Sequence, residues 1–408
     1  MRFTEVLVMA LVFLLCFATC DGPRTKPGGS EVVSDKSEAV AVLKPQVVVL
    51  KQGDRMVDGV ESKIGFEDGF TAAQFTDGRN GWAGTENSLY RTTDGGATWK
   101  RLTLNLPLDS HISSFFFIDK ANGWLTVVNQ SDVERYGLGN SSCILASSDG
   151  GGSWVQQASF PDEVDIGCIR FLNGNQGLAF GARVVAEKPP YNEILALSTM
   201  DGGKKWNNIS ETLKAALRNE YGIAADYAHY IDWSSPSRIL CLTRYGRLIG
   251  STDQGQTWKV IARFKDERPG GYISSTGYYK LVLDTRGRIS VIAGSEGEEG
   301  YWGDFVINDD RDSWVSYELI RTPFRDAVFL SDREVLACGI EVHVSDGDVK
   351  SQRPPQGIIL HSIDGGRSWS AIYRSKSNKG FFSLTKVGND EFYAVGDDGT
   401  FLRFAFGK

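Results

Sequence analysis

The chain has 408 residues, of which 41% are hydrophobic, with 46 glycines and only 12 prolines. This composition suits many short strands joined by tight turns. The net charge of −7 argues against nucleic acid as a partner, because phosphate binding requires a basic surface.

Residues 1–20 have the pattern of an export signal. Arg2 precedes the apolar run Val6–Ala18, which is too short to cross a bilayer comfortably. The run ends at Phe17-Ala18-Thr19-Cys20, which resembles a bacterial lipobox. A lipid anchor on Cys20 and ordinary cleavage nearby both stay open. We expect an exported protein, periplasmic, in the cell envelope or secreted, that meets a membrane only through such an anchor.

The export signal is followed by a polar stretch, residues 21–45, which contains Pro23, Pro27 and Gly28-Gly29. Such a segment cannot bury enough apolar surface to fold alone, so we predict a flexible tether. The lone apolar strand Gln46–Leu50 comes next. A single folded domain is predicted over residues 46–408.

A short motif, Ser/Thr-x-Asp-x-Gly-x-Thr/Ser-Trp, recurs along this domain and is here called the Asp-box. The copy at 199–206 is weaker, and the copy at 307–314 is degenerate. The aspartate can accept hydrogen bonds from the turn, glycine permits a positive φ, and the tryptophan packs between sheets. We therefore predict a structural rather than catalytic role for the box residues Asp94, Trp99, Asp149, Trp154, Asp201, Trp206, Asp253, Trp258, Asp309, Trp314, Asp364 and Trp369.

The spacing of the box tryptophans is regular, at 52 to 56 residues. This period with alternating strand patterns predicts an all-β propeller with one four-stranded blade per repeat. After Trp369 the chain supplies three further strands, at Phe381–Leu384, Glu391–Val395 and Thr400–Phe406. The N-terminal strand Gln46–Leu50 would complete this last blade and remove an exposed sheet edge. Seven blades are predicted, with six or eight as alternatives.

A second motif precedes the first two boxes. It reads Phe-x-Asp-x-x-x-Gly-Trp and begins at Phe75 and at Phe117. Together with the Asp-box it resembles the photosystem II stability/assembly factor-like family of seven-bladed propellers, over roughly residues 46–408. The resemblance implies an exported, often lipid-anchored protein that binds other proteins during assembly. It transfers no binding residue, because the matching positions are structural.

Sialidases and related glycosidases also carry Asp-boxes, so a carbohydrate-active propeller is the alternative, either a sialidase-like glycosidase or a glycan-binding lectin. Neither Arg55 nor Arg79 begins the Arg-Ile-Pro motif that such enzymes usually carry. Motifs for a serine nucleophile, a nucleotide phosphate or zinc are also missing from the sequence. We therefore favour a monomeric binding protein with no catalytic residues, metal or cofactor, and leave the question of catalysis open.

Long connections between strands B and C, or D and A, are predicted to enlarge one face of the propeller, the loop-rich face. They are Asn129–Ser142, Arg183–Asn192, Gly294–Gly303, Glu341–Gly357 and Asn207–Ala228, the last with a short helix over Glu211–Asn219. A protein partner, or alternatively a glycan, is expected there. The candidate binding residues are Glu298, Glu299, Tyr301, Trp302, His343, Tyr227, His229 and Tyr230.

Four cysteines follow the export signal, and none has the spacing of a metal or redox pair. Cys241 and Cys338 lie in apolar runs and are predicted to be buried. A disulfide between Cys143 and Cys168 stays open, because sequence alone cannot assign it.

Overall fold

The computed structural model describes residues 41–43, 45–48, 50–52, 57, 59–63, 69–106, 110–130, 140–160, 164–185, 191–217, 228–243, 246–266, 278–297, 300–308, 314–342, 355–376, 380–388 and 390–406. Residues Ala39–Lys408 form one compact unit. The predicted signal at 1–20 and most of the tether at 21–45 lie outside the described residues. The first described strand, β1 (Ala41–Leu43), already begins within the predicted tether.

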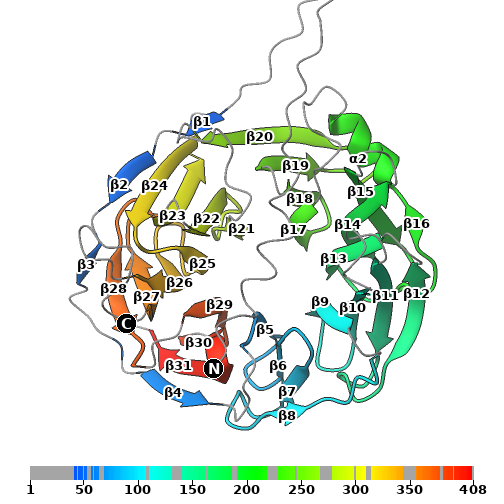
Figure 1. Ribbon diagram of the computed structural model, residues 1–408, viewed down its shortest axis with the longest axis horizontal. Helices are drawn as coiled ribbons and strands as arrows, with labels where there is room; N and C mark the ends of the chain where they lie inside the picture. Colours follow the sequence, from blue (N-terminus) through cyan, green and yellow to red (C-terminus); the bar gives the residue numbers. More distant parts are fainter. Residues whose placement is uncertain are drawn as a thin grey trace, which may run out of the picture. The chain divides into compact units, whose positions relative to one another are not determined.

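Seven antiparallel sheets form a ring of blades around a central axis (Figure 1). The first strand of each blade is innermost. Blades one to three are β5 (Ala72–Phe75), β6 (Gly81–Gly84), β7 (Leu89–Thr92) and β8 (Lys100–Arg101); β9 (Ser110–Phe117), β10 (Gly123–Gln130), β11 (Asn140–Ser147) and β12 (Val155–Phe160); and β13 (Val164–Phe171), β14 (Gly177–Val185), β15 (Tyr191–Thr199) and β16 (Asn207–Asn208).

Blades four to six are β17 (Ala228–Ser235), β18 (Arg238–Thr243), β19 (Arg247–Ser251) and β20 (Lys259–Asp266); β21 (Tyr278–Leu283), β22 (Ile289–Gly297), β23 (Gly300–Asn308) and β24 (Trp314–Ile320); and β25 (Phe324–Phe329), β26 (Val335–Glu341), β27 (Gln356–Ser362) and β28 (Ser370–Arg374). Blade seven contains β29 (Phe381–Lys386), β30 (Glu391–Gly396) and β31 (Thr400–Ala405). The predicted seven-bladed propeller is confirmed.

An N-terminal strand closes blade seven, as predicted, but it is not the predicted one. The closing strand is β4 (Gly59–Lys63), which runs antiparallel to β31. The predicted strand, Gln46–Leu50, overlaps β2 (Pro45–Val48), which instead pairs in parallel with β24 of blade five. An apolar run fits any uncovered sheet edge, so its composition alone did not specify which edge it would cover.

The segment before β4 runs along the outer edges of three blades, and we call residues 41–57 the strap. Its strands β1, β2 and β3 (Lys51–Gln52) pair in parallel with β20, β24 and β28. Beyond β3, the Val57 amide donates to the Ile372 carbonyl at 3.0 Å. Figure 1 shows these blue strands outside the ring. The strap satisfies edge groups that would otherwise invite pairing with another chain.

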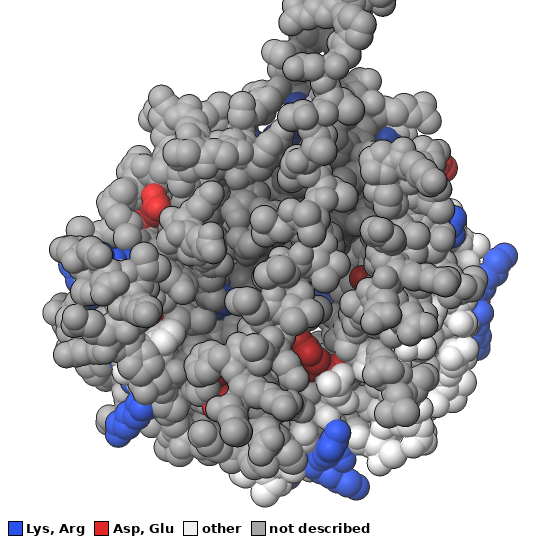
Figure 2. Space-filling view, in the orientation of Figure 1, with Lys and Arg blue, Asp and Glu red and all other residues white. Residues whose placement is uncertain are grey.

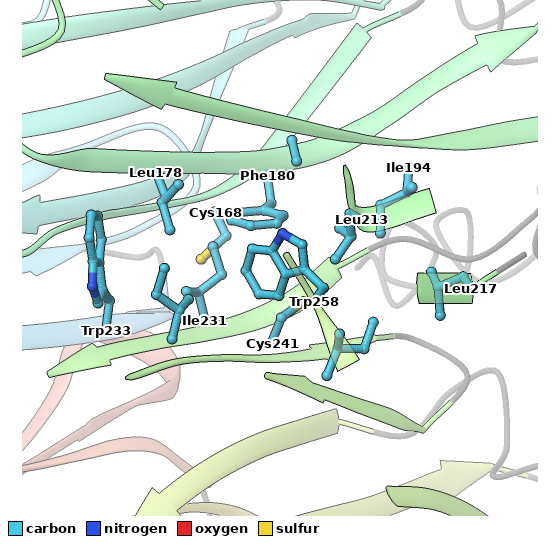
Figure 3. Close-up of a cluster of buried hydrophobic side chains, with 13 residues drawn as sticks. Cys168, Leu178, Phe180, Ile194, Leu213, Leu217, Ile231, Trp233, Cys241 and Trp258 are labelled. Carbon is cyan, nitrogen blue, oxygen red and sulfur yellow. The ribbon is translucent and has the colours of Figure 1, made fainter. Parts of the chain in front are cut away.

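Blade three ends in a helix instead of a long outer strand. After the two-residue β16, α2 (Ser210–Leu217) turns its buried Leu213 and Leu217 toward a cluster between blades three and four. Figure 3 shows Leu213 beside Phe180 and Trp258, with Leu217 farther along the helix. The Ser210 hydroxyl accepts a hydrogen bond from the Ala196 amide of β15 at 2.9 Å. The predicted helix is confirmed, beginning at Ser210 and ending at Leu217.

The four described cysteines are free thiols, so the Cys143–Cys168 disulfide left open by the sequence is not formed. Cys168, Cys241 and Cys338 are buried in the core, while Cys143 is half-buried. Burial raises the pKa of the Cys143 and Cys338 thiols. These thiols therefore act as small apolar side chains. Among the helices of the described ranges, none is long and apolar enough to span a membrane.

Two N-terminal truncations should separate the roles of the strap and of β4. A variant beginning at Gly53 loses β1 to β3, exposes three sheet edges, and is expected to melt at a lower temperature but still cooperatively. A variant beginning at Gly69 also loses β4, which leaves blade seven with three strands and should abolish the cooperative transition. Circular dichroism melts check both. Equal melting of the two variants would contradict the assignment of closure to β4.

Candidate functional site

The Asp-box carboxylates are used by their own turns. The Asp94 side chain accepts the Thr98 amide at 2.9 Å and hydroxyl at 2.5 Å, as well as the Thr92 hydroxyl at 2.8 Å. Gly95 and Gly96 follow with φ of 72° and 84°, which favour glycine. The same bonds recur at Asp149, Asp253 and Asp364.

These bonds lower the pKa of several box aspartates. At Asp94 the bonds to Thr98 lower the pKa to about 2, and corresponding bonds have the same effect at Asp149 and Asp253. Asp201 keeps the amide bond, from Lys205 at 2.9 Å. Asp309 lies outside the described residues. Carboxylates held ionised by a turn are poor general acids, so the described Asp-boxes carry structure rather than chemistry.

Strand geometry favours the inner strands as the place for a site. Five of them contain a β-bulge at equivalent positions, where one residue is skipped in the pairing with the second strand: Ser113, Gly167, His229, Arg325 and Phe382. In three blades the second strand has a glycine opposite the bulge. A Cβ on Gly181, Gly339 or Gly396 would come within 1.8 to 2.1 Å of a carbonyl on the inner strand or just before it. Bulges re-aim side chains, and they recur next to functional sites.

Asp326 on β25 holds three blades together. Its buried carboxylate forms an ion pair with Lys280 of β21. It also accepts the Ser383 hydroxyl at 3.1 Å and the Leu384 amide at 3.0 Å, both from β29. The Ala327 amide donates to it at 2.7 Å. A buried carboxylate with this many donors is a structural anchor.

Lys280 continues the contacts in the other direction. Its ammonium lies 5.9 Å from the ring centroid of Tyr230 on β17, and the Arg170 guanidinium of β13 lies 5.6 Å from the same ring. Arg170 also lies 5.5 Å from the Phe116 ring of β9. Burial is the largest single effect and acts to lower the pKa of Lys280, but the charge of Asp326, Tyr230 and the hydrogen bond to Asp326 together outweigh it, so the pKa lies above its ordinary value. Lys280 therefore stays charged at neutral pH.

Two further contacts complete a circuit of all seven inner strands. The Gln74 amide of β5 both donates to and accepts from the Phe117 backbone of β9, at 2.7 and 2.9 Å. The Ala73 amide donates to the Ser383 hydroxyl at 3.4 Å. We call the side chains of this circuit the inner belt: Gln74, Arg170, Tyr230, Lys280, Asp326 and Ser383.

A pair of titratable side chains outside the inner belt lies where the inner strands begin, at the loop-rich face. His111 of β9 and Asp165 of β13 are both half-buried. Burial raises the pKa of Asp165 above its ordinary value of 3.8, and the charge of His111 acts in the opposite direction. Among the residues placed in the structure, no group of three His, Cys, Asp or Glu side chains could hold a metal ion. Figure 2 shows basic side chains at the periphery of the visible face and an acidic group near its centre.

The structure brings only one of the predicted binding residues into a defined environment, namely Tyr230 in the inner belt. His229 is the bulge residue of β17, and Tyr301 and Trp302 lie on β23 opposite β22. The remaining predicted residues fall outside the described part of the chain: Tyr227, Glu298, Glu299 and His343.

One predicted loop is wrong. Gly294–Gly303 was expected to be a long insertion, but β22 and β23 pair along it as far as Gly297 and Gly300, which makes an extended hairpin. The two strands continue their backbone pairing through this segment. A glycine-rich composition alone does not distinguish a loop from such a hairpin. The other predicted insertions have strands at both ends, and most of their interiors lie outside the described residues.

Sequence reasoning missed the ionic members of the inner belt, Arg170, Lys280 and Asp326. The signal was present: each interrupts an otherwise apolar or aromatic first strand, as in Ile169-Arg170-Phe171. Charged residues in a buried strand need a partner. The partners come from neighbouring blades, and only the blade order of the fold brings them together.

Comparisons with known proteins show which proteins this chain is similar to. No protein-family model matches the sequence. The photosystem II assembly lipoprotein Ycf48 of Synechococcus sp. strain CC9902 is 23% identical over 335 residues, which cover 81% of this chain and 83% of that protein. A solved structure titled "YCF48 bound to D1 peptide" superposes with a TM-score of 0.57 at 18% identity, covering 88% of this chain and all of the other. The resemblance to the assembly factor-like family is confirmed.

Xyloglucanases are a second, more distant group of matches. The enzyme of Paenibacillus sp is 22% identical over 305 residues, covering 72% of this chain but only 24% of the enzyme. The xyloglucanase structure from Xanthomonas campestris has a TM-score of 0.54 at 13% identity, and the match covers 53% of it. At such identities the structural likeness shows the fold alone.

Removing the Asp326 charge should destabilise the propeller. Asp326→Asn leaves the Lys280 ammonium without its counter-charge and weakens two acceptor bonds, so we expect a loss of about 3 kcal/mol in the free energy of unfolding. Adding Lys280→Met should recover part of this loss, because the uncompensated charge is then removed. Chemical denaturation measures both. No recovery in the double variant would show that the ion pair is not the main contribution.

Asp165 should make stability depend on pH. A carboxyl whose pKa is raised by folding stabilises the fold below its ordinary pKa, and this contribution is lost as the pH rises through the raised value. Asp165→Asn, which stays neutral, is therefore expected to melt above the wild type at about pH 7 and level with it at about pH 3. Thermal melts across this range test it. A difference that does not vary with pH would point to packing instead.

Proposed function

We propose that this chain is a non-enzymatic, extracytoplasmic assembly-factor propeller that engages a protein partner through its loop-rich face. The observation that carries the proposal is the relationship to Ycf48, whose name describes an assembly lipoprotein and whose solved structure holds a D1 peptide. The partner of this chain is then a polypeptide. Nucleic acid is not proposed, in keeping with the net charge of −7.

The inner belt supports a binding role over a hydrolytic one. A glycosidase needs a pair of carboxyl groups free to act as acid and base or nucleophile. Asp326 is instead engaged by the Lys280 ammonium and by donors from β29. Within the described part of the chain Asp165 accepts no such hydrogen bonds, and it lies with His111 at the loop-rich end. We place the partner contact around this pair.

The proposal extends to the residues of the expected binding surface and to localisation. Tyr230, with His229 beside it on β17, lies on an inner strand that begins at this face. We propose export through the signal at residues 1–20, with lipidation of Cys20 as the membrane anchor and a monomeric propeller held outside the cytoplasm. The lipoprotein name of the Synechococcus relative supports the anchor.

Glycan binding or hydrolysis is the second candidate, favoured by the xyloglucanase matches. Release of reducing ends from xyloglucan by the purified chain would establish it. The assay is independent of any protein partner, so its outcome bears on this candidate alone.

Site-specific photo-crosslinking should locate the partner surface. A photoreactive residue in place of the half-buried His111, at the loop-rich face, is expected to capture a discrete envelope protein in the native membrane fraction. The same residue in place of the exposed Ala97, in the first Asp-box, is the matched control and should capture little.

The crosslinked species are compared on gels and identified by mass spectrometry. Equal capture at both positions, or capture only at Ala97, would contradict binding through the loop-rich face. Loss of the His111 crosslink in a Cys20→Ala variant would additionally place the contact at a membrane.

A further inference from the structure

Aromatic side chains join blade one to blade two in a defined way. Trp82 on β6 reaches into the next blade and stacks on Phe117, with ring centroids 3.8 Å apart and an interplanar angle of 8°. Its indole N–H donates to the carbonyl of Gly150, the first glycine of the Asp-box in blade two, at 3.0 Å. One ring therefore makes two specific contacts, a stack and a hydrogen bond.

The same two contacts recur at two other junctions between blades. The stacked centroids there are 3.4 and 4.8 Å apart. The residues are Trp124 with Phe171 and Gly202, and Tyr393 with Phe75 and Gly95. Each donor ring comes from the second strand of a blade, and each acceptor is the first box glycine of the next blade.

The junction between blades five and six has the receiving half of this arrangement without the ring. Ile289 pairs with Leu283, as Gly123 pairs with Phe117 in blade two, so Ser290 occupies the position of Trp124. In blade six, Phe329 corresponds to Phe117 and Phe171, and Gly365 corresponds to Gly150 and Gly202. The amide of Gly365 bonds to the Arg333 carbonyl, as that of Gly150 bonds to Ala121.

A cleft of about 210 Å³ lies at this junction. Ser290, Ile307, Phe329 and Gly365 line it, and we call it the slot. Phe305 packs on Gly366 and against Phe329 at 6.2 Å, and the slot remains beside it. The slot opens on the Asp-box face, opposite the loop-rich face.

The residue that covers the ring at the first junction differs at the slot. At the first junction Arg91 lies over the Trp82 ring at 5.6 Å and donates to the Asp149 and Lys120 carbonyls. At the slot Ile307 replaces this arginine, and the corresponding carbonyls bond to two separate side chains. Arg367 donates to Asp364 at 2.8 Å, and Arg288 donates to Asp332 at 2.8 Å.

The glycine positions show the resulting space. A Cβ on Gly150 would meet Arg91 at 2.2 Å, whereas the nearest atom to a Cβ on Gly365 is 3.4 Å away. More space therefore lies beside Gly365 than beside Gly150, although Gly365 itself is buried.

We propose that the slot binds the indole side chain of a polypeptide partner. The ring stacks on Phe329 and donates its N–H to the Gly365 carbonyl, reproducing the contacts that Trp82 and Trp124 make inside the chain. We favour a polypeptide as the source of the indole because the three internal counterparts, Trp82, Trp124 and Tyr393, are all side chains of β-strands. The site is distinct from the loop-rich face, so it stands whether or not that face binds a partner.

Substitution Ser290→Trp tests the shape of the slot. The introduced indole should occupy the slot and raise the melting temperature by several degrees. The fluorescence of this added tryptophan should be quenched when it lies in the slot. Leu336→Trp is the matched control, because Leu336 is the equivalent residue of blade six and is fully buried in the core. Overpacking should lower its melting temperature. A drop in Ser290→Trp as large as that in Leu336→Trp would overturn the proposal.

Ligand-observed saturation-transfer NMR tests binding with the full chain. N-acetyl-tryptophanamide at millimolar concentration is expected to receive saturation from the wild type, and N-acetyl-leucinamide is not. Ser290→Trp and Phe329→Ala should each abolish the signal, the first by filling the slot and the second by removing its stacking face. No signal with the wild type, or an unchanged signal in both variants, would overturn the site.

Discussion

Main-chain pairing of β4 with β31 joins the two ends of the chain into a ring. If the last blade lacked its outer strand, the backbone hydrogen-bonding groups at that sheet edge would stay unpaired beside the core. The strap extends the same constraint outward, because β1 to β3 cover the edges of blades four to six. Blades one and three limit their edges differently, with a two-residue outer strand and, in blade three, the helix α2.

Closure fixes the distance from one inner strand to the next, and the inner belt depends on that distance. Arg170, Tyr230, Lys280 and Asp326 come from four consecutive blades and contact one another in series across the three junctions between them. The belt therefore joins blades near the axis, while four box tryptophans contact aromatic rings of the preceding blade farther out. Because the polar side chains of the inner belt are used in contacts between blades, we expect partner recognition at the ends of the inner strands instead.

The features that recur in every repeat could be predicted from the sequence, whereas few of the features that occur once could be. Six boxes with regular spacing were enough for seven blades, since each box encodes its own turn. The closing strand was misassigned because Gln46–Leu50 and Gly59–Lys63 compete for several equivalent edges. The ionic members of the belt were missed because each comes from a different blade, as Lys280 and Asp326 do at 46 residues apart, and each looks like an isolated charge in the sequence. Ser290 gave no signal at all, since a serine is conspicuous only beside Trp82 and Trp124 in the folded repeat.

The strap also sets an order of events during synthesis. Ala41 pairs with Phe264, and Gly59 pairs with Phe404, so the first folded residues to leave the ribosome have no partner until most of the chain has followed. Contacts this distant in sequence are the slow ones to form. The N-terminal strands have no partner until the blades they pair with have formed, so their docking is a late step in folding.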